Sequence, residues 1–293
     1  PVFTREFATT PRSWRLYFSR ALYVLTLFGL VLTARLIVFG SRPVQGLGDP
    51  ARFGASVFGL LAPVQLALAV AFSALLAAAA VAQEKDRRTL DLLLMTRMTN
   101  AELVLGKLLA SMLTVLVLIG ASVPLFMLLT LLGGMSLEQI AGVVGVTLTA
   151  AILAGSLGST LALWREKGFQ AIALTTVILM LWLLSGEALA TGLLGPQLAG
   201  MAAEQWAAAL TPAQPLANDL DPLPVVGRPV YAFLIITAAA AALLNGWAIF
   251  RVRVWNPSRE AGYDAQESAS EAESTEKGSA DVHAAPGASR EVW

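Results

Sequence analysis

Six long apolar stretches constrain this chain more than any other feature of its sequence. Each is about 20 residues or longer, which is enough for a helix to cross the roughly 30 Å hydrocarbon core of a bilayer. With 56% hydrophobic residues, 14% charged residues and a mean hydropathy of +0.68, the chain is too apolar for a water-soluble domain. We therefore predict an all-α polytopic membrane protein with six transmembrane helices, at approximately residues 21–40, 57–82, 103–132, 138–163, 169–193 and 230–250.

Lysine and arginine are distributed unevenly between the segments that join these stretches. If the N-terminus is cytoplasmic, 16 of the 20 basic residues fall in cytoplasmic segments and three in external ones, with Arg35 inside the first span. Basic residues collect on the cytoplasmic side of membrane proteins, so we expect both termini to be cytoplasmic. We expect a multi-pass protein of a prokaryotic plasma membrane. The net charge is zero, so the total by itself says nothing about nucleic acid, and we expect no nucleic-acid partner.

The segments outside the spans differ in composition. Residues 1–20 interleave arginines with aromatic side chains, as expected for an amphipathic helix on the anionic cytoplasmic surface or for a simple basic flank of the first span. Residues 21–255 form the transmembrane domain, and residues 256–293 read as a disordered acidic tail. In the external segment 194–229, which contains six prolines, we expect a helix over 197–210 packed on the spans and an irregular loop thereafter.

The fourth span carries a stripe of small residues. Ala150, Ala154 and Gly158 follow one another at four-residue spacing, a pattern that lets helix backbones approach closely. The partner helix could belong to the same chain or to a second one. We favour the same chain, because a six-helix bundle needs such contacts in any case.

The charged stretch between the second and third spans, residues 83–109, predicts a cytoplasmic coupling element. Residues 86–96 read as a short helix in the membrane interface, with leucines on one face and charged residues on the other. The leucines are Leu90, Leu93 and Leu94, and the charged residues are Arg87, Arg88 and Asp91. Thr99 and Glu102 have the spacing of a capping box, which predicts that a new helix begins there.

The string from Glu84 to Lys107, EKDRRTLDLLLMTRMTNAELVLGK, resembles the first cytoplasmic loop of type-two ATP-binding-cassette (ABC) export permeases. In that family an acidic and basic cluster precedes a Thr-Leu-acid-Leu-Leu run, and Gly-Lys opens the next span. The start of the chain, PVFTREF, is similar to the family's N-terminal cytoplasmic helix. By the number and order of its spans, the resemblance covers roughly residues 1 to 255.

The resemblance implies an exporter in which two permease chains, identical or homologous, form the pathway for a substrate that the sequence does not identify. A separate ATP-binding subunit would hold ATP and magnesium and dock on the cytoplasmic loops. The residues expected to couple the two subunits come mainly from the first loop, with two lesser contacts in the second. They are Glu84, Arg87, Arg88, Leu90, Asp91, Leu93 and Leu94, followed by Glu166 and Lys167.

We expect no catalytic residue, metal site or cofactor in this chain itself. The one Gly-Lys pair, Gly106-Lys107, is followed by leucine and has no upstream glycine, so it is not a nucleotide-binding P-loop. There is no cysteine, and the single histidine, His283, lies in the polar tail.

Two ionisable residues, Arg35 and Glu187, fall within the outer halves of predicted spans. They either pair across the bundle and line an outer vestibule, or each extends to its own interface. Neither provides the midplane carboxylate of a proton-driven pump. Two other functions stay open at this point: an ion-gradient-driven secondary transporter, and a membrane scaffold or anchor subunit without transport.

Overall fold

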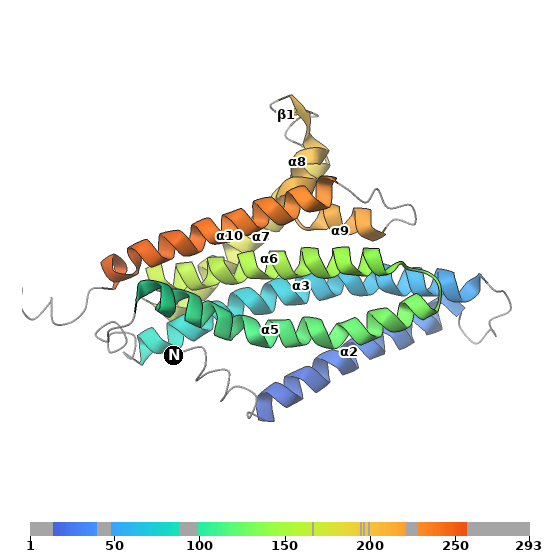
Figure 1. Cartoon of the computed structure of the whole chain (residues 1–293), viewed down its shortest axis with the longest axis horizontal. Coiled ribbons are helices and arrows are strands. Elements are labelled where there is room, and N and C mark those ends of the chain that lie inside the picture. Colours follow the sequence, from blue (N-terminus) through green and yellow to red (C-terminus); the bar gives the residue numbers. More distant parts are fainter. Residues whose placement is uncertain are drawn as a thin grey trace, which may run out of the picture.

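The structure, a computed structural model, describes residues 14–39, 48–87, 99–165, 167–193, 195, 197–198, 200–220 and 228–256. These residues form a bundle of long helices with two short helices and a two-stranded hairpin, and the hairpin projects from the side of the bundle (Figure 1). The hairpin pairs Gln197 with Ala202 in antiparallel register. The elements are α2 (Trp14–Phe39), α3 (Asp49–Asp86), α5 (Asn100–Leu131), α6 (Leu137–Trp164), α7 (Gly168–Ala190), β1 (Gln197–Leu198), β2 (Met201–Ala202), α8 (Ala203–Leu210), α9 (Ala213–Leu220) and α10 (Arg228–Trp255).

Five of the described helices, α3, α5, α6, α7 and α10, are long and apolar enough to cross a membrane. The protein is therefore a helical, multi-pass membrane protein. The predicted first span lies in α2, a continuous helix of 26 residues whose apolar part, Ala21–Leu36, is shorter than the other five. Residues 14–20 continue this helix, and residues 1–13 of the predicted amphipathic helix lie outside the described residues. The predicted acidic tail also lies outside them, apart from Asn256.

Helix α3 lies at the centre of the bundle and packs most closely against α6. The small-residue stripe of α6 makes this contact: Gly158 lies so close to the main chain of Ala74 that a Cβ atom would overlap the Ala74 carbonyl. Two turns earlier along α6, the Ser73 hydroxyl donates a hydrogen bond to the carbonyl of Ala151. The prediction that the stripe packs within the chain is confirmed, because backbones this close leave no room for side chains between the two helices.

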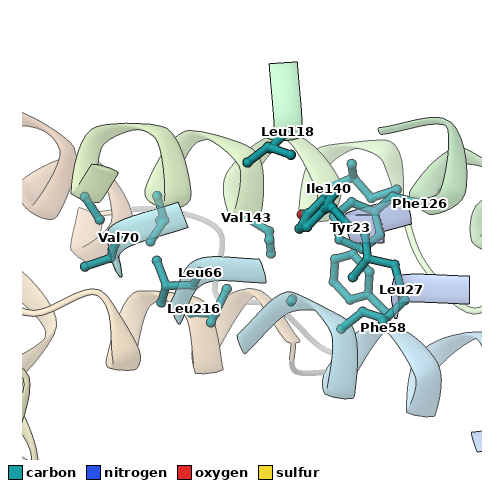
Figure 2. Close-up of a cluster of buried hydrophobic side chains, with 14 of the residues drawn as sticks. Tyr23, Leu27, Phe58, Leu66, Val70, Leu118, Phe126, Ile140, Val143 and Leu216 are labelled. Carbon is teal, nitrogen blue, oxygen red and sulfur yellow. The ribbon is translucent and has the colours of Figure 1, made fainter. Parts of the chain in front are cut away.

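The half of the bundle farther from Asp86 contains a large apolar cluster to which α2, α3, α5, α6 and α9 all contribute (Figure 2). The rings of Phe58 and Phe126 meet edge to face, with their centroids 5.2 Å apart. Leu27 of α2 is almost fully buried against this cluster. Helix α2 is thereby attached to the bundle mainly through its contacts in this half.

The described part of the predicted external segment contains more helix than its prolines indicate. Helix α8 covers the second part of the helix predicted over 197–210, but the hairpin β1–β2 occupies its first part, so the prediction is wrong there. Helix α9 stands where an irregular loop was expected over 213–220, which is also wrong, and residues 221–227 lie outside the described residues. Pro215 lies in the first turn of α9, where the backbone N–H that proline lacks would have no intrahelical partner. Leu216 is 3% exposed and packs in the apolar cluster. Trp182 of α7 also holds this segment, since its indole N–H donates to the carbonyl of Leu210 at 2.9 Å.

Candidate functional site

Five helix ends meet at the pole of the bundle that we name the basic end, on the left in Figure 1. Helices α3, α6 and α10 finish there, at Asp86, Trp164 and Trp255, and α5 and α7 begin there. The two predicted cytoplasmic loops therefore leave the bundle from the same end. The described basic side chains of this end are Lys85, Arg87, Lys107, Arg165, Lys167, Arg251 and Arg253.

Glu84 in the last turn of α3 forms an ion pair with Lys107 in the second turn of α5. Both side chains are largely buried, with 20% of Glu84 and 11% of Lys107 exposed. Breaking a pair in such an environment costs more than breaking a fully exposed one, because the remaining charge stays poorly solvated. The pair thus fixes the end of α3 to the start of α5, across the loop that joins them.

Lys85 holds the end of α6. Its ammonium group donates to the carbonyl of Leu163 at 2.6 Å and to the carbonyl of Arg165 at 2.9 Å. Carbonyls in the last turn of a helix have no intrahelical partner, and a positive charge is favourable there. The Asn256 amide also donates to the Leu163 carbonyl, at 3.2 Å, which brings the end of α10 to the same point.

Asp86 lies against the start of α7. A Cβ atom added to Gly168 would be 3.2 Å from one carboxylate oxygen of Asp86 and 2.9 Å from the Cβ of Ala82. The absence of a side chain at Gly168 lets α7 begin against α3, and a carboxylate at a helix N-terminus is electrostatically favourable. Three consecutive residues, Glu84, Lys85 and Asp86, therefore contact three different helices. Successive side chains of a helix point about 100° apart, so three consecutive residues of a central helix can contact three different neighbours. We call this arrangement the α3 clasp.

A polar contact joins α5 to α10 at the basic end. The Asn100 amide donates to the Ile249 carbonyl at 3.0 Å, and Arg253 donates through Nε to the Asn100 side-chain oxygen at 2.7 Å. Next to it, the predicted capping box is confirmed, with the Glu102 amide donating to the Thr99 hydroxyl at 3.2 Å and the Thr99 amide to the Glu102 carboxylate at 3.0 Å. The basic end is thus a connected set of helix ends.

Comparison with protein families agrees with this architecture. The family described as ABC-2 family transporter protein matches residues 1–250, which is most of the chain. The chain belongs to the ABC-2 transporter family. No curated protein matches it in a sequence comparison. Membership confirms the resemblance seen in the first loop, and it implies that this ABC-2 protein is a membrane-spanning transport subunit whose partner is an ATP-binding-cassette subunit.

The structure places only some of the predicted coupling residues of the ABC-2 protein. Glu84 lies in the α3 clasp, Arg87 is exposed at the C-cap of α3, and Lys167 is exposed at the N-cap of α7. The other predicted coupling residues lie outside the described residues: Arg88, Leu90, Asp91, Leu93, Leu94 and Glu166. Their role stays a prediction. Lys85 and Asp86 were not predicted as site residues, although both stand in the charged string that carried the resemblance.

Arg35 and Glu187, the predicted vestibule pair, are both exposed in the ABC-2 protein. The structure records no ion pair between these two described residues. Both interpretations, pairing across the bundle and extension of each side chain to its own interface, stay predictions.

Polar residues also lie inside the apolar bundle of the ABC-2 protein, and sequence reasoning passed over them. The Asn245 amide of α10 donates to the Ser156 hydroxyl of α6 at 2.8 Å. Gln65 of α3 is fully buried, and neither atom of its amide group has a hydrogen-bond partner among the described residues. A glutamine within a long apolar run was the available signal, since polar side chains inside a membrane are costly and mark function or packing.

Proposed function

We propose that this chain is the permease subunit of an ABC exporter, moving an unidentified substrate with ATP that a separate subunit hydrolyses. ATP and magnesium bind that partner, and a second permease chain, identical or homologous, completes the pathway. The family match over residues 1–250 is the observation that carries the proposal. Five helices that fit a membrane and two loops that leave the bundle at one basic end support it.

The α3 clasp supplies a physical route for coupling. Because the last turn of α3 contacts α5 through Glu84, α6 through Lys85 and α7 through Asp86, a force applied to the chain after Asp86 acts on four helices together. We assign contact with the ATP-binding subunit to the exposed Arg87 and Lys167 and to the loop residues around them. These are Arg88, Leu90, Asp91, Leu93, Leu94 and Glu166. Glu84 serves within the clasp, which transmits movement from that contact into the bundle.

The proposed topology has six spans, with α2 as the first and both termini in the cytoplasm. A helix of 26 residues is about 39 Å long, which exceeds the hydrocarbon thickness of a bilayer. The basic end then faces the cytoplasm, in agreement with the excess of lysine and arginine on that side. The amphipathic N-terminal helix and the plasma-membrane location belong to the same proposal.

The experiment compares Leu93→Asp and Arg88→Glu with wild type at matched membrane abundance. The measurements are pull-down of the ATP-binding subunit and its ATPase rate in the complex. The control is Leu193→Asp, the same substitution at an 80% exposed leucine beyond the far end of α7. Leu93→Asp should weaken both signals, because an interfacial leucine becomes a charge. Arg88→Glu should weaken docking if the partner surface is acidic, and high salt should reduce that effect.

The control should retain binding and stimulated ATPase. If both loop variants also retain wild-type binding and stimulated ATPase, the loop does not couple the subunits. Substrate movement in vesicles that contain only this chain, driven by a proton or sodium gradient, would instead support a secondary transporter.

A further inference from the structure

A groove of about 450 Å³ lies between α6 and α10 near the basic end. Three residues of α6, Thr160, Leu161 and Trp164, form one wall, and a stripe of α10 forms the other. The stripe consists of residues three or four apart, which share one face of a helix: Leu244, Trp247, Arg251 and Trp255. The groove thus combines three tryptophans with one arginine, and none of the residues that line it is acidic.

Guanidinium groups lie on two of these tryptophan rings. The Arg251 guanidinium is 5.9 Å from the centre of the Trp247 ring, and the Arg165 guanidinium is 4.2 Å from the centre of the Trp164 ring. Arg251 is exposed, and no carboxylate in the described part of the chain forms an ion pair with it. Stacking on an indole holds a guanidinium in place while leaving its N–H donors available to an anion. The mouth of the groove is therefore positively charged and rich in donors.

The groove lies beside an exposed apolar surface of α10. Both of its helices are long and apolar enough to cross the membrane and end nearby, at Trp164 and Trp255, so the groove lies where the helices leave the hydrocarbon. Tryptophan and arginine are the side chains expected at that depth. Three large apolar residues of α10 continue from Trp247 at helical spacing and are strongly exposed: Leu243 (75%), Phe250 (77%) and Val254 (63%). A molecule entering the groove reaches it along this apolar surface.

We propose that the groove binds an anionic phospholipid of the leaflet at the basic end. The lipid phosphate is held by Arg251 with Arg165 nearby, and an acyl chain lies against the tryptophans and Leu244. Charge selects the lipid, because two guanidinium groups attract an anionic headgroup and disfavour a cationic one. The volume is within the range of small-molecule sites. This assignment needs the membrane-embedded bundle, and it does not depend on docking of the ATP-binding partner.

The test uses the full chain purified in detergent and titrated with lipids whose brominated acyl chains quench tryptophan fluorescence. Phosphatidylglycerol and phosphatidylcholine with identical brominated chains differ only in the headgroup. Wild type should be quenched at about fivefold lower concentration by the anionic lipid, the preference that one arginine near an anionic headgroup provides. Arg251→Gln should reduce this preference, and what remains comes from Arg165. Arg52→Gln, which removes an exposed arginine at the other end of the bundle, should keep it.

Trp247→Phe gives an independent measurement that leaves the charge intact. It should reduce the amplitude of quenching by the anionic lipid, because one of the quenched indoles is lost. Equal quenching of wild type by the two lipids, an unchanged preference in Arg251→Gln, or an unchanged amplitude in Trp247→Phe would each overturn the assignment. Protection of the tryptophans by inorganic phosphate would assign the groove to a soluble anion, and a dimer that shields Trp247 would assign it to a second copy. Both results overturn the lipid site.

Discussion

Replacing Lys85 with methionine should detach the end of α6 from α3. Methionine keeps an unbranched side chain that is one atom shorter, but it cannot donate to the carbonyls of Leu163 and Arg165, which now accept at 2.6 and 2.9 Å. A hydrogen bond to a charged group contributes about 1.5–3 kcal/mol. Lys85 is only partly buried, so water replaces some of the loss, and we expect about 2 kcal/mol for the two bonds together.

Thermal unfolding of the purified chain in detergent measures this loss. For a chain of this size, about 2 kcal/mol corresponds to a fall in Tm of roughly 4–8 °C. Lys167→Met is the matched control, since it removes the same charge from the same end at an exposed side chain that makes no capping bond. The control should shift Tm by less than about 2 °C. If the two variants have the same Tm, Lys85 does not hold α6, and the α3 clasp loses one of its three contacts.

Three further predictions follow from packing and topology. Gly158→Ala should destabilise the chain by about 1–3 kcal/mol, because the new methyl group overlaps the Ala74 main chain. Gly120→Ala places its methyl group in open space and should be neutral or stabilising. A lower Tm for Gly120→Ala than for Gly158→Ala would contradict this. Gln65→Leu should leave Tm unchanged or raise it, since the buried amide has no hydrogen-bond partner in the described residues. Asn245→Leu should cost about 1 kcal/mol, because it loses the hydrogen bond to Ser156. A lower Tm for Gln65→Leu than for Asn245→Leu would refute this interpretation. Single cysteines in this cysteine-free chain should report its topology through labelling by an impermeant thiol reagent in intact cells. Cysteines at Gly48, Ser136 and Asp219 should react, and a cysteine at Ser270 should not. Labelling at Ser270 would rule out a cytoplasmic C-terminus.

Many of the helices could be predicted, because a membrane span depends mainly on the hydropathy of its own stretch of sequence. The predicted span 138–163 matches α6, Leu137–Trp164, within one residue at each end. Its start is marked by Ser136 and Gln139, which form a capping box that the sequence pattern already contains. Helix α3 instead begins eight residues before its predicted span, at Asp49, because Pro50 in its first turn favours a helix start and hydropathy alone does not register it.

The candidate site was less predictable because it depends on which helices surround α3. The sequence shows Glu84, Lys85 and Asp86 as part of one charged cluster, and such a cluster is most simply assigned to a partner surface. Only the packing shows that the three side chains contact α5, α6 and α7 in turn. Helix α9 was missed for a related reason, since the burial of Leu216 against distant helices outweighs the proline-rich composition around it.

The central claim is that this chain is the permease of an ATP-driven transporter. The most direct test isolates the chain from its native membrane in a mild detergent and identifies the chains that co-purify with it. We predict that an ATP-binding-cassette subunit accompanies it, that the complex hydrolyses ATP, and that the chain isolated alone does not. The opposite result would contradict the claim: a chain that purifies without any ATP-binding subunit and, reconstituted alone in vesicles, moves its substrate in response to a proton or sodium gradient.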